Sequence, residues 1–96
     1  IVEIKVDRSS FNDIKIYPNP SVGQVQISVK VNIGEKVEAK LYDNTGRLVL
    51  NSIIDAVSDG SELNSVIESE LLKKGVYFVE INIDGRVSSH KLIILK

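Results

Sequence analysis

Side chains that could carry out chemistry are few and scattered in this 96-residue sequence. Asp43 with Asn44, and Asp84 with Asn82, could supply oxygen ligands for calcium, but neither pair has the spacing of an EF-hand loop. Aspartate and asparagine are also favoured in tight turns, because their side chains bond nearby backbone groups. We predict this turn role for both pairs and no metal site.

Nucleophiles, general bases and phosphate-binding loops are equally poorly represented. His90 is the only histidine and the sequence contains no cysteine, so a multi-histidine metal site, a thiolate zinc site and a cysteine nucleophile have no residues to form them. We predict that His90 is a surface or edge residue, rather than a pH-sensitive binding group. The six glycines lie far apart, each beside a turn, and form no phosphate-binding loop. The sequence therefore predicts no catalytic residues, no cofactor and no enzyme.

Charge and hydropathy exclude further classes of function. Twelve basic and thirteen acidic residues are mixed along the chain and give a net charge of -1, so no basic patch for nucleic acid is present. No apolar run reaches the roughly 20 residues of a membrane-spanning helix. The sequence opens at Ile1, without a signal peptide, and we expect it to be a piece of a longer protein.

The apolar residues indicate strands, since isoleucine, valine and leucine dominate and alternate with polar residues. Predicted strands cover 1–6, 14–17, 24–31, 36–42, 47–51, 75–83 and 86–96. The stretch 52–61 is ambiguous, 62–68 fits a strand or a weak helical turn, and 69–74 fits one helical turn. Hairpin turns are predicted at 43–46 and 84–85. Seven or eight short strands at this spacing predict an all-β fold, an antiparallel sandwich with an Ig-like arrangement.

A sugar-binding platform would expose several aromatic side chains, so the positions of the aromatic residues in this sequence bear on that function. The sequence contains Phe11, Tyr17, Tyr42, Tyr77 and Phe78. Most lie inside predicted strands, so we predict that they pack in the core. An Ig-like adhesion or carbohydrate-binding module nevertheless remains the alternative function.

The stiffest part of the chain is 17–23, which contains both of its prolines. Pro18 and Pro20 fix two φ angles and hold Tyr17 and Asn19 out of the helical region. Gly23 is expected to supply conformational freedom at the exit of this turn.

Four short motifs in a fixed order carry a family resemblance. They are YPNPSVG at 17–23, YDNTGR at 42–47, LLKKGVYFV at 71–79 and KLIILK at 91–96. With the last one at the end of the chain, the sequence resembles the C-terminal sorting domain of the type IX (Por) secretion system of Bacteroidetes, type A family. The resemblance covers about residues 14–96, and leaves 1–13 as an N-terminal lead, a linker or a first strand.

This resemblance implies an Ig-like sandwich at the end of a larger secreted cargo protein. The family implies that such a cargo crosses the inner membrane with a signal peptide, passes through an outer-membrane translocon and is typically cleaved by a cell-surface sortase. The cargo is then secreted or held at the cell surface, with attachment to lipopolysaccharide as one option. Cleavage would fall in or before 7–13, although the strand-like 1–6 could instead belong to the fold. The residues that match the family motifs are Pro18, Asn19, Pro20, Gly23, Gly75, Tyr77, Lys91 and Lys96.

The final predicted strand has two interpretations that can both hold. It could offer backbone donors to a partner sheet and, with Lys96, form part of what the translocon reads. Alternatively, the apolar run Leu92–Leu95 completes the core. A run of this kind predicts burial on both faces of the strand.

Overall fold

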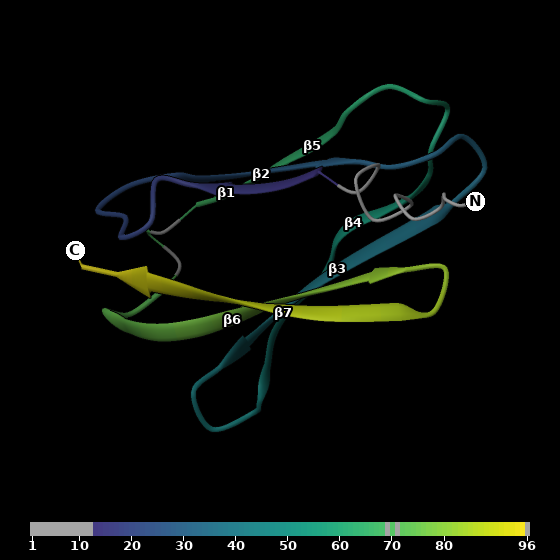
Figure 1. The fold of residues 1–96 in the computed structure, drawn as a ribbon. Helices are drawn as coiled ribbons and strands as arrows, with labels where there is room; N and C mark the ends of the chain where they lie inside the picture. Colours follow the sequence, from purple (N-terminus) through teal and green to yellow (C-terminus); the bar gives the residue numbers. More distant parts are fainter. Residues whose placement is uncertain (1–12, 69, 71, 96) are drawn as a thin grey trace, which may run out of the picture.

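Two antiparallel sheets packed face to face make up the computed structural model, which describes residues 13–68, 70 and 72–95 (Figure 1). The strands are β1 (Asp13–Tyr17), β2 (Val25–Lys30), β3 (Lys36–Asp43), β4 (Leu48–Val57), β5 (Leu63–Ile67), β6 (Gly75–Ile83) and β7 (Arg86–Ile94). The predicted antiparallel sandwich is confirmed. The strand predicted at 1–6 lies outside the described residues.

The strand order defines the kind of sandwich. One sheet has the order β1-β2-β5 and the other β4-β3-β6-β7. In an Ig constant-type domain the fourth strand joins the sheet of the first two. Here it pairs with β3 instead, which is a variant of the same Ig-like plan. β1 and β7 are edge strands of their sheets, and they lie on the same side of the sandwich, since residues of both line one recess.

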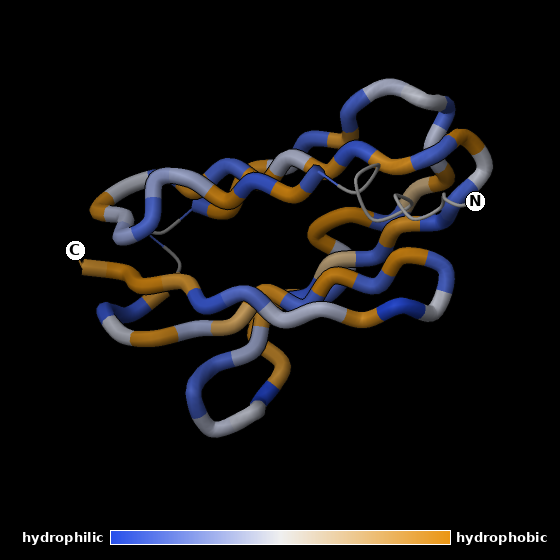
Figure 2. Tube along the Cα trace, viewed as in Figure 1, coloured by the Kyte–Doolittle hydropathy of each residue, from blue (hydrophilic) through white to orange (hydrophobic). Residues whose placement is uncertain are grey.

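The core lies between the two sheets and follows the alternation of the sequence. The inward residues of β2 and β3 are fully buried, as predicted for Val25, Ile27 and Val37. Figure 2 shows the same alternation of apolar and polar residues along the strands of both sheets. Because side chains alternate across a strand, each sheet contributes one apolar face to this core.

Both predicted hairpins form. Asp84 and Gly85 connect β6 to β7 with φ angles of 49° and 91°, as a two-residue hairpin with two positive φ angles requires. At the other hairpin Gly46 has a φ of 88° and its N–H donates to the carbonyl of Asp43 at 3.0 Å. The local turn signals of the sequence were therefore sufficient to fix these connections.

The structure resolves two ambiguous stretches and corrects one prediction. The stretch 52–61 continues β4 as far as Val57, and 62–68 contains strand β5. The helical turn expected at 69–74 includes positions 69 and 71, which lie outside the described residues. The prediction of burial on both faces at the end of the chain is wrong: Leu92 and Ile94 are buried, whereas Leu95 is 50% exposed. The reason is that β7 is an edge strand whose outer face has no layer above it.

No helix in the described part of the chain combines the length and the apolar character needed to cross a bilayer.

Candidate recognition site at the end of the last strand

Residues 18–23, which we call the proline segment, link β1 to β2 and run along the outer edge of β7 (Figure 1). Ser21 forms a parallel bridge with Ile94. Its N–H donates to the carbonyl of Ile93 at 2.9 Å, and its carbonyl accepts from the N–H of Leu95 at 2.8 Å. A connection between two strands of one sheet thus pairs, over one residue, with the edge of the other sheet.

Asn19 extends this pairing with its side chain. Its Nδ2 donates to the carbonyl of Lys91 at 2.8 Å, and its Oδ1 accepts from the N–H of Ile93 at 3.1 Å. A carboxamide has the same donor and acceptor as a peptide group. Pro18 and Pro20 have no N–H to donate, so the side chain between them supplies the bonds that a regular strand would make through its backbone.

The hydroxyl of Ser21 holds the exit of the proline segment. Ser21 is fully buried, and its Oγ accepts from the N–H of Gly23 at 3.2 Å and lies 3.0 Å from the carbonyl of the same residue. These hydrogen bonds compensate for the free-energy cost of burying the hydroxyl away from water. Gly23 itself has no positive φ, and a Cβ on it would meet no atom within 4 Å. The expectation that Gly23 supplies unusual backbone freedom is therefore wrong.

The glycine–tyrosine motif lies on the opposite side of the same stretch of β7. In the ladder of β6 and β7, Gly75 is opposite Ile94 and Tyr77 is opposite Leu92. Gly75 has a φ of 154°, which side-chain-bearing residues rarely adopt. Tyr77 is 8% exposed, and its hydroxyl donates to the carbonyl of Lys73 at 2.7 Å. The end of β7 is thus held by one motif on each side.

Of the two lysines in the C-terminal motif, the structure describes one. Lys91 is exposed on the outer face of β7, opposite Phe78 of β6. Lys96 lies outside the described residues. Of the eight residues predicted for recognition, seven therefore lie in the described part, in two segments that border the end of β7 and on β7 itself.

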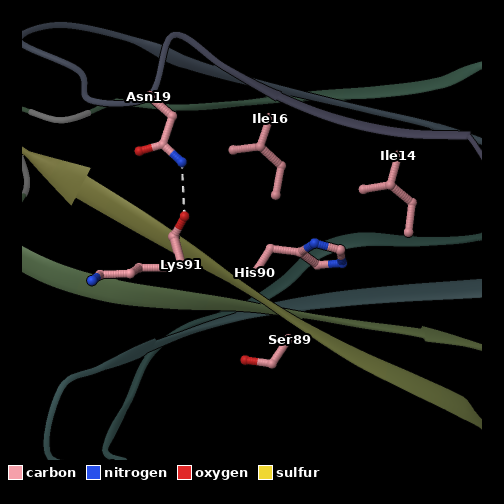
Figure 3. Close-up of a pocket in the computed structure, with 6 residues that line it drawn as sticks. All are labelled: Ile14, Ile16, Asn19, Ser89, His90 and Lys91. Carbon is pink, nitrogen blue, oxygen red and sulfur yellow. Dashed lines mark hydrogen bonds between the residues drawn. The ribbon is translucent and has the colours of Figure 1, made fainter.

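A recess of about 410 Å³ opens between the two edge strands on this side of the sandwich (Figure 3). It is lined by Ile14, Ile16, Asn19, Ser89, His90 and Lys91. The side chains of Ile14 and Ile16 point from β1 toward the ring of His90 (Figure 3). His90 is half-buried and its Nε2 lies 2.9 Å from the hydroxyl of Ser88. The desolvation that comes with burial lowers the pKa of this imidazole.

The prediction for His90 as an edge residue is confirmed, and the turn role of the acidic pairs is confirmed for the side chains of Asp43 and Asn82. The Asp43 carboxylate accepts from the N–H groups of Thr45 and Arg47 at 2.9 and 3.0 Å. Bonds from the Thr45 hydroxyl and these backbone groups lower the pKa of Asp43 to about 2. Asn82 accepts from the N–H of Gly85 at 2.7 Å. The oxygens of Asp43 and Asn82 thus close the hairpins, whereas the Asp84 carboxylate accepts from the N–H of Lys36 at the start of β3 at 3.0 Å.

The prediction that the aromatic residues pack in the core holds for Tyr77 but is wrong for others. Tyr42 and Phe78 are paired neighbours on the outer face of the larger sheet and only half-buried. Tyr17 is 47% exposed. The reason is the strand period: Tyr42 follows the inward Leu41, and successive side chains point to opposite faces. Phe11 lies outside the described residues.

Sequence reasoning missed Ser21 and the contact between the proline segment and the last strand. Asn19 and Lys91 are 72 residues apart, and no local pattern links them. The available signal was the asparagine between two prolines. Because the two prolines have no N–H, the asparagine side chain offers a hydrogen-bond donor between them for a neighbouring strand.

Together these observations define an Ig-like β-sandwich module whose last strand lies at a sheet edge and is fastened there by a proline segment. The chain belongs to the family of secretion system C-terminal sorting domains, whose family model matches residues 15–95. No curated protein and no solved structure matches the chain.

Membership identifies the chain as a C-terminal sorting signal of type IX secretion. Domains of this family are generally non-catalytic. The family implies secretion to the cell surface or the extracellular space.

Proposed function

We propose that the chain is the non-catalytic sorting domain of a larger cargo protein, which it directs from the periplasm through the type IX translocon to the cell surface. The observation that carries this proposal is the meeting of three family motifs at one place. The proline segment, the start of β6 and the end of β7 are far apart in sequence and adjacent in the fold. A label that serves varied cargo needs such a self-contained feature.

Within this site we assign two kinds of role. Four of the motif residues shape the surroundings of β7: Pro18, Pro20, Gly75 and Tyr77. Gly23 contributes through its backbone N–H, which donates to the hydroxyl of Ser21. Asn19 fastens the strand, as its two hydrogen bonds to β7 indicate.

The remaining motif residues are the two lysines. Lys91 and Lys96 present positive charge, Lys91 on the exposed face of the strand. We propose that the translocon reads these charges together with the strand end. A sortase then cleaves the cargo in or before 7–13.

Export of a reporter tests this proposal. An unrelated periplasmic reporter with the 96-residue chain fused at its C-terminus is expected to reach the medium or cell surface of a competent host. Removal of residues 95 and 96 takes away the N–H that Ser21 binds and one terminal lysine, and is expected to trap the reporter in the periplasm. An Asn44→Ala variant in the distant β3–β4 turn is the control. Undiminished export of the truncated form would refute the role of the strand end.

A second function has one specific observation in its favour. Tyr42 and Phe78 line a shallow recess of about 470 Å³ on the outer face of the larger sheet, beside the β3–β4 turn. Exposed aromatic rings are a common platform for sugars, so this face suits the alternative of a carbohydrate-binding or adhesion module. A glycan array with the isolated chain separates the two functions. The sorting function predicts no hits, and hits that disappear in a Phe78→Ala variant would favour the binding module.

A further inference from the structure

We propose that the first half of β7, from Val87 to the amide of Lys91, is a docking edge where an extended segment of the translocon adds as a new strand of the larger sheet. This inference rests on the sorting function proposed above and specifies how the domain is gripped. The occupant is a backbone in extended conformation that carries an apolar side chain opposite His90.

Free backbone groups on β7 supply the first argument. Alternate residues of this strand direct their N–H and C=O groups away from β6. The proline segment forms hydrogen bonds with four of these outward groups: the N–H and C=O of Ile93, the C=O of Lys91 and the N–H of Leu95. By the same alternation, both groups of Val87 and Ser89 and the N–H of Lys91 point outward. Within the described part of the chain, these groups have no hydrogen-bond partner. They can be satisfied in a regular way only by an extended backbone.

The proline segment supplies the second argument, because it already uses this edge as a strand would. The Asn19 carboxamide and the Ser21 backbone bind β7 at 91–95 in the positions of an added strand. The proposed partner continues that pairing toward Arg86. Asn19 therefore also sets where the added strand must stop, at Lys91.

Of the three other edges of the described sandwich, β4 and β5 are less suited to a new strand. β4 has register shifts in its pairing with β3, and Ser52 within it has a φ of 53°. Irregularities of this kind protect edge strands from unwanted pairing. β5 lies beside β4, so a neighbour already covers that side. The first half of β7 has neither a bulge nor a proline.

The recess between β1 and β7 defines the side chain that the partner inserts. Residues opposite Ser88 and His90 in an added strand would face inward, because directly paired residues point to the same side. They would lie over Ile14 and Ile16, which Figure 3 shows pointing toward His90. Ile14 and Ile16 form the apolar part of this recess, and desolvation lowers the pKa of the neighbouring His90 imidazole. A side chain that reaches these two isoleucines is therefore expected to be apolar, because a charge there would lose water without gaining a partner.

A proline at position 89 tests the docking edge. Ser89→Pro removes one outward N–H and leaves the bonds between β6 and β7 intact, and proline is tolerated at such edge positions. Asn44→Pro is the matched control, since proline suits the second position of the β3–β4 turn. Ser89→Ala keeps the amide and separates loss of the hydroxyl from loss of the N–H. Far-UV circular dichroism and thermal unfolding verify that each variant is folded.

Reporter export is the readout, with the 96-residue chain at the C-terminus of the reporter. We expect Ser89→Pro to reduce export at least tenfold, while Asn44→Pro and Ser89→Ala are exported like the original chain. Equal export of the folded Ser89→Pro variant would overturn the docking edge and leave the sorting function in place. If the original chain itself is not exported, the sorting function fails first.

Amide exchange supplies a measurement that does not depend on any substitution. On addition of purified, detergent-solubilised type IX translocon, the amides of Val87, Ser89 and Lys91 are expected to exchange at least tenfold more slowly, and that of Asp55 on β4 to be unchanged. Protection confined to other positions would contradict the proposal. So would protection of the same amides in the free domain at high concentration, because the occupant would then be a second copy of the chain.

Discussion

At the scale of single residues, the unusual feature is an asparagine that acts as part of a strand. Asn19 lies between two prolines and bonds β7 through its carboxamide. The prolines restrict the segment in the unfolded chain as well as in the fold, so the side chain is presented at a low entropic cost.

Replacement of Asn19 measures this contribution. Asn19→Ala removes both side-chain bonds to β7, and we expect it to lower the free energy of unfolding by about 1–2 kcal/mol. For a domain of this size, each kcal/mol corresponds to a fall in Tm of about 4–8 °C. Asn44→Ala, in an exposed turn, is expected to change the free energy of unfolding by less than about 0.5 kcal/mol. Equal Tm values for both variants would show that the bonds contribute nothing.

The two glycines of the family motifs are expected to behave differently. Gly75→Ala forces a side chain into a backbone with a φ of 154°, which costs about 1–3 kcal/mol. Gly23→Ala meets open space and no positive φ, so its stability should match that of the original chain. Urea unfolding measures the free energy of unfolding of both variants. A larger decrease for Gly23→Ala than for Gly75→Ala would contradict the structure.

Asp43 predicts a specific pH dependence of stability. Its pKa of about 2 in the fold lies below the usual aspartate value of 3.8. Its contribution to stability is therefore complete above the unfolded pKa and is lost as pH falls from about 3.8 toward 2. In Asp43→Asn this part of the acid-induced loss should disappear. Thermal unfolding of both proteins between pH 6 and pH 2 checks this, and parallel Tm curves through that window would contradict it.

At the scale of elements, β7 is one strand with two different halves. Its inner edge pairs with β6 along the whole length, from Arg86 to Ile94. Among the residues that the structure describes, its outer edge is occupied only where the proline segment runs. Turns and alternation made the strand itself predictable. The pairing partner of its outer edge was not predictable, because that contact joins residues far apart in sequence.

Amide exchange should reveal this division in the isolated domain. The amides of Ile93 and Leu95 are bonded to Asn19 and Ser21 and should exchange slowly. The amide of Ser89 points outward without a partner in the described part of the chain and should exchange at least tenfold faster. In Asn19→Ala the exchange of Ile93 should accelerate more than that of Leu95. Equal protection along the whole outer edge would contradict the pairing scheme.

At the scale of the whole molecule, the sandwich and most of its strands followed from the sequence, because the inward positions of β2, β3 and β6 are apolar and the two predicted hairpins have their turn residues. The sequence alone left the extension of β4 to Val57 and strand β5 open. The exposed face was harder to predict. Tyr42 and Phe78 are outward although they lie in strong strands, and Leu95 is exposed at the end of an apolar run. The sequence shows which residues share a face but not which face is covered, since that depends on the order of strands in the sheet.

The same strand order accounts for the proposed function. β7 forms one edge of the larger sheet and β4 the other, and β7 lies next to the connection that contains the proline segment. The last strand is thereby both part of the core, through Leu92 and Ile94, and accessible from outside.

The most direct test of the central claim compares one fusion in two hosts. A folded reporter with the 96-residue chain at its C-terminus is expressed in a type IX-competent strain and in the same strain lacking the translocon, and surface and medium fractions are quantified. The account predicts export in the competent strain and periplasmic retention in the other. Equal export from both strains, or retention in both, would contradict it.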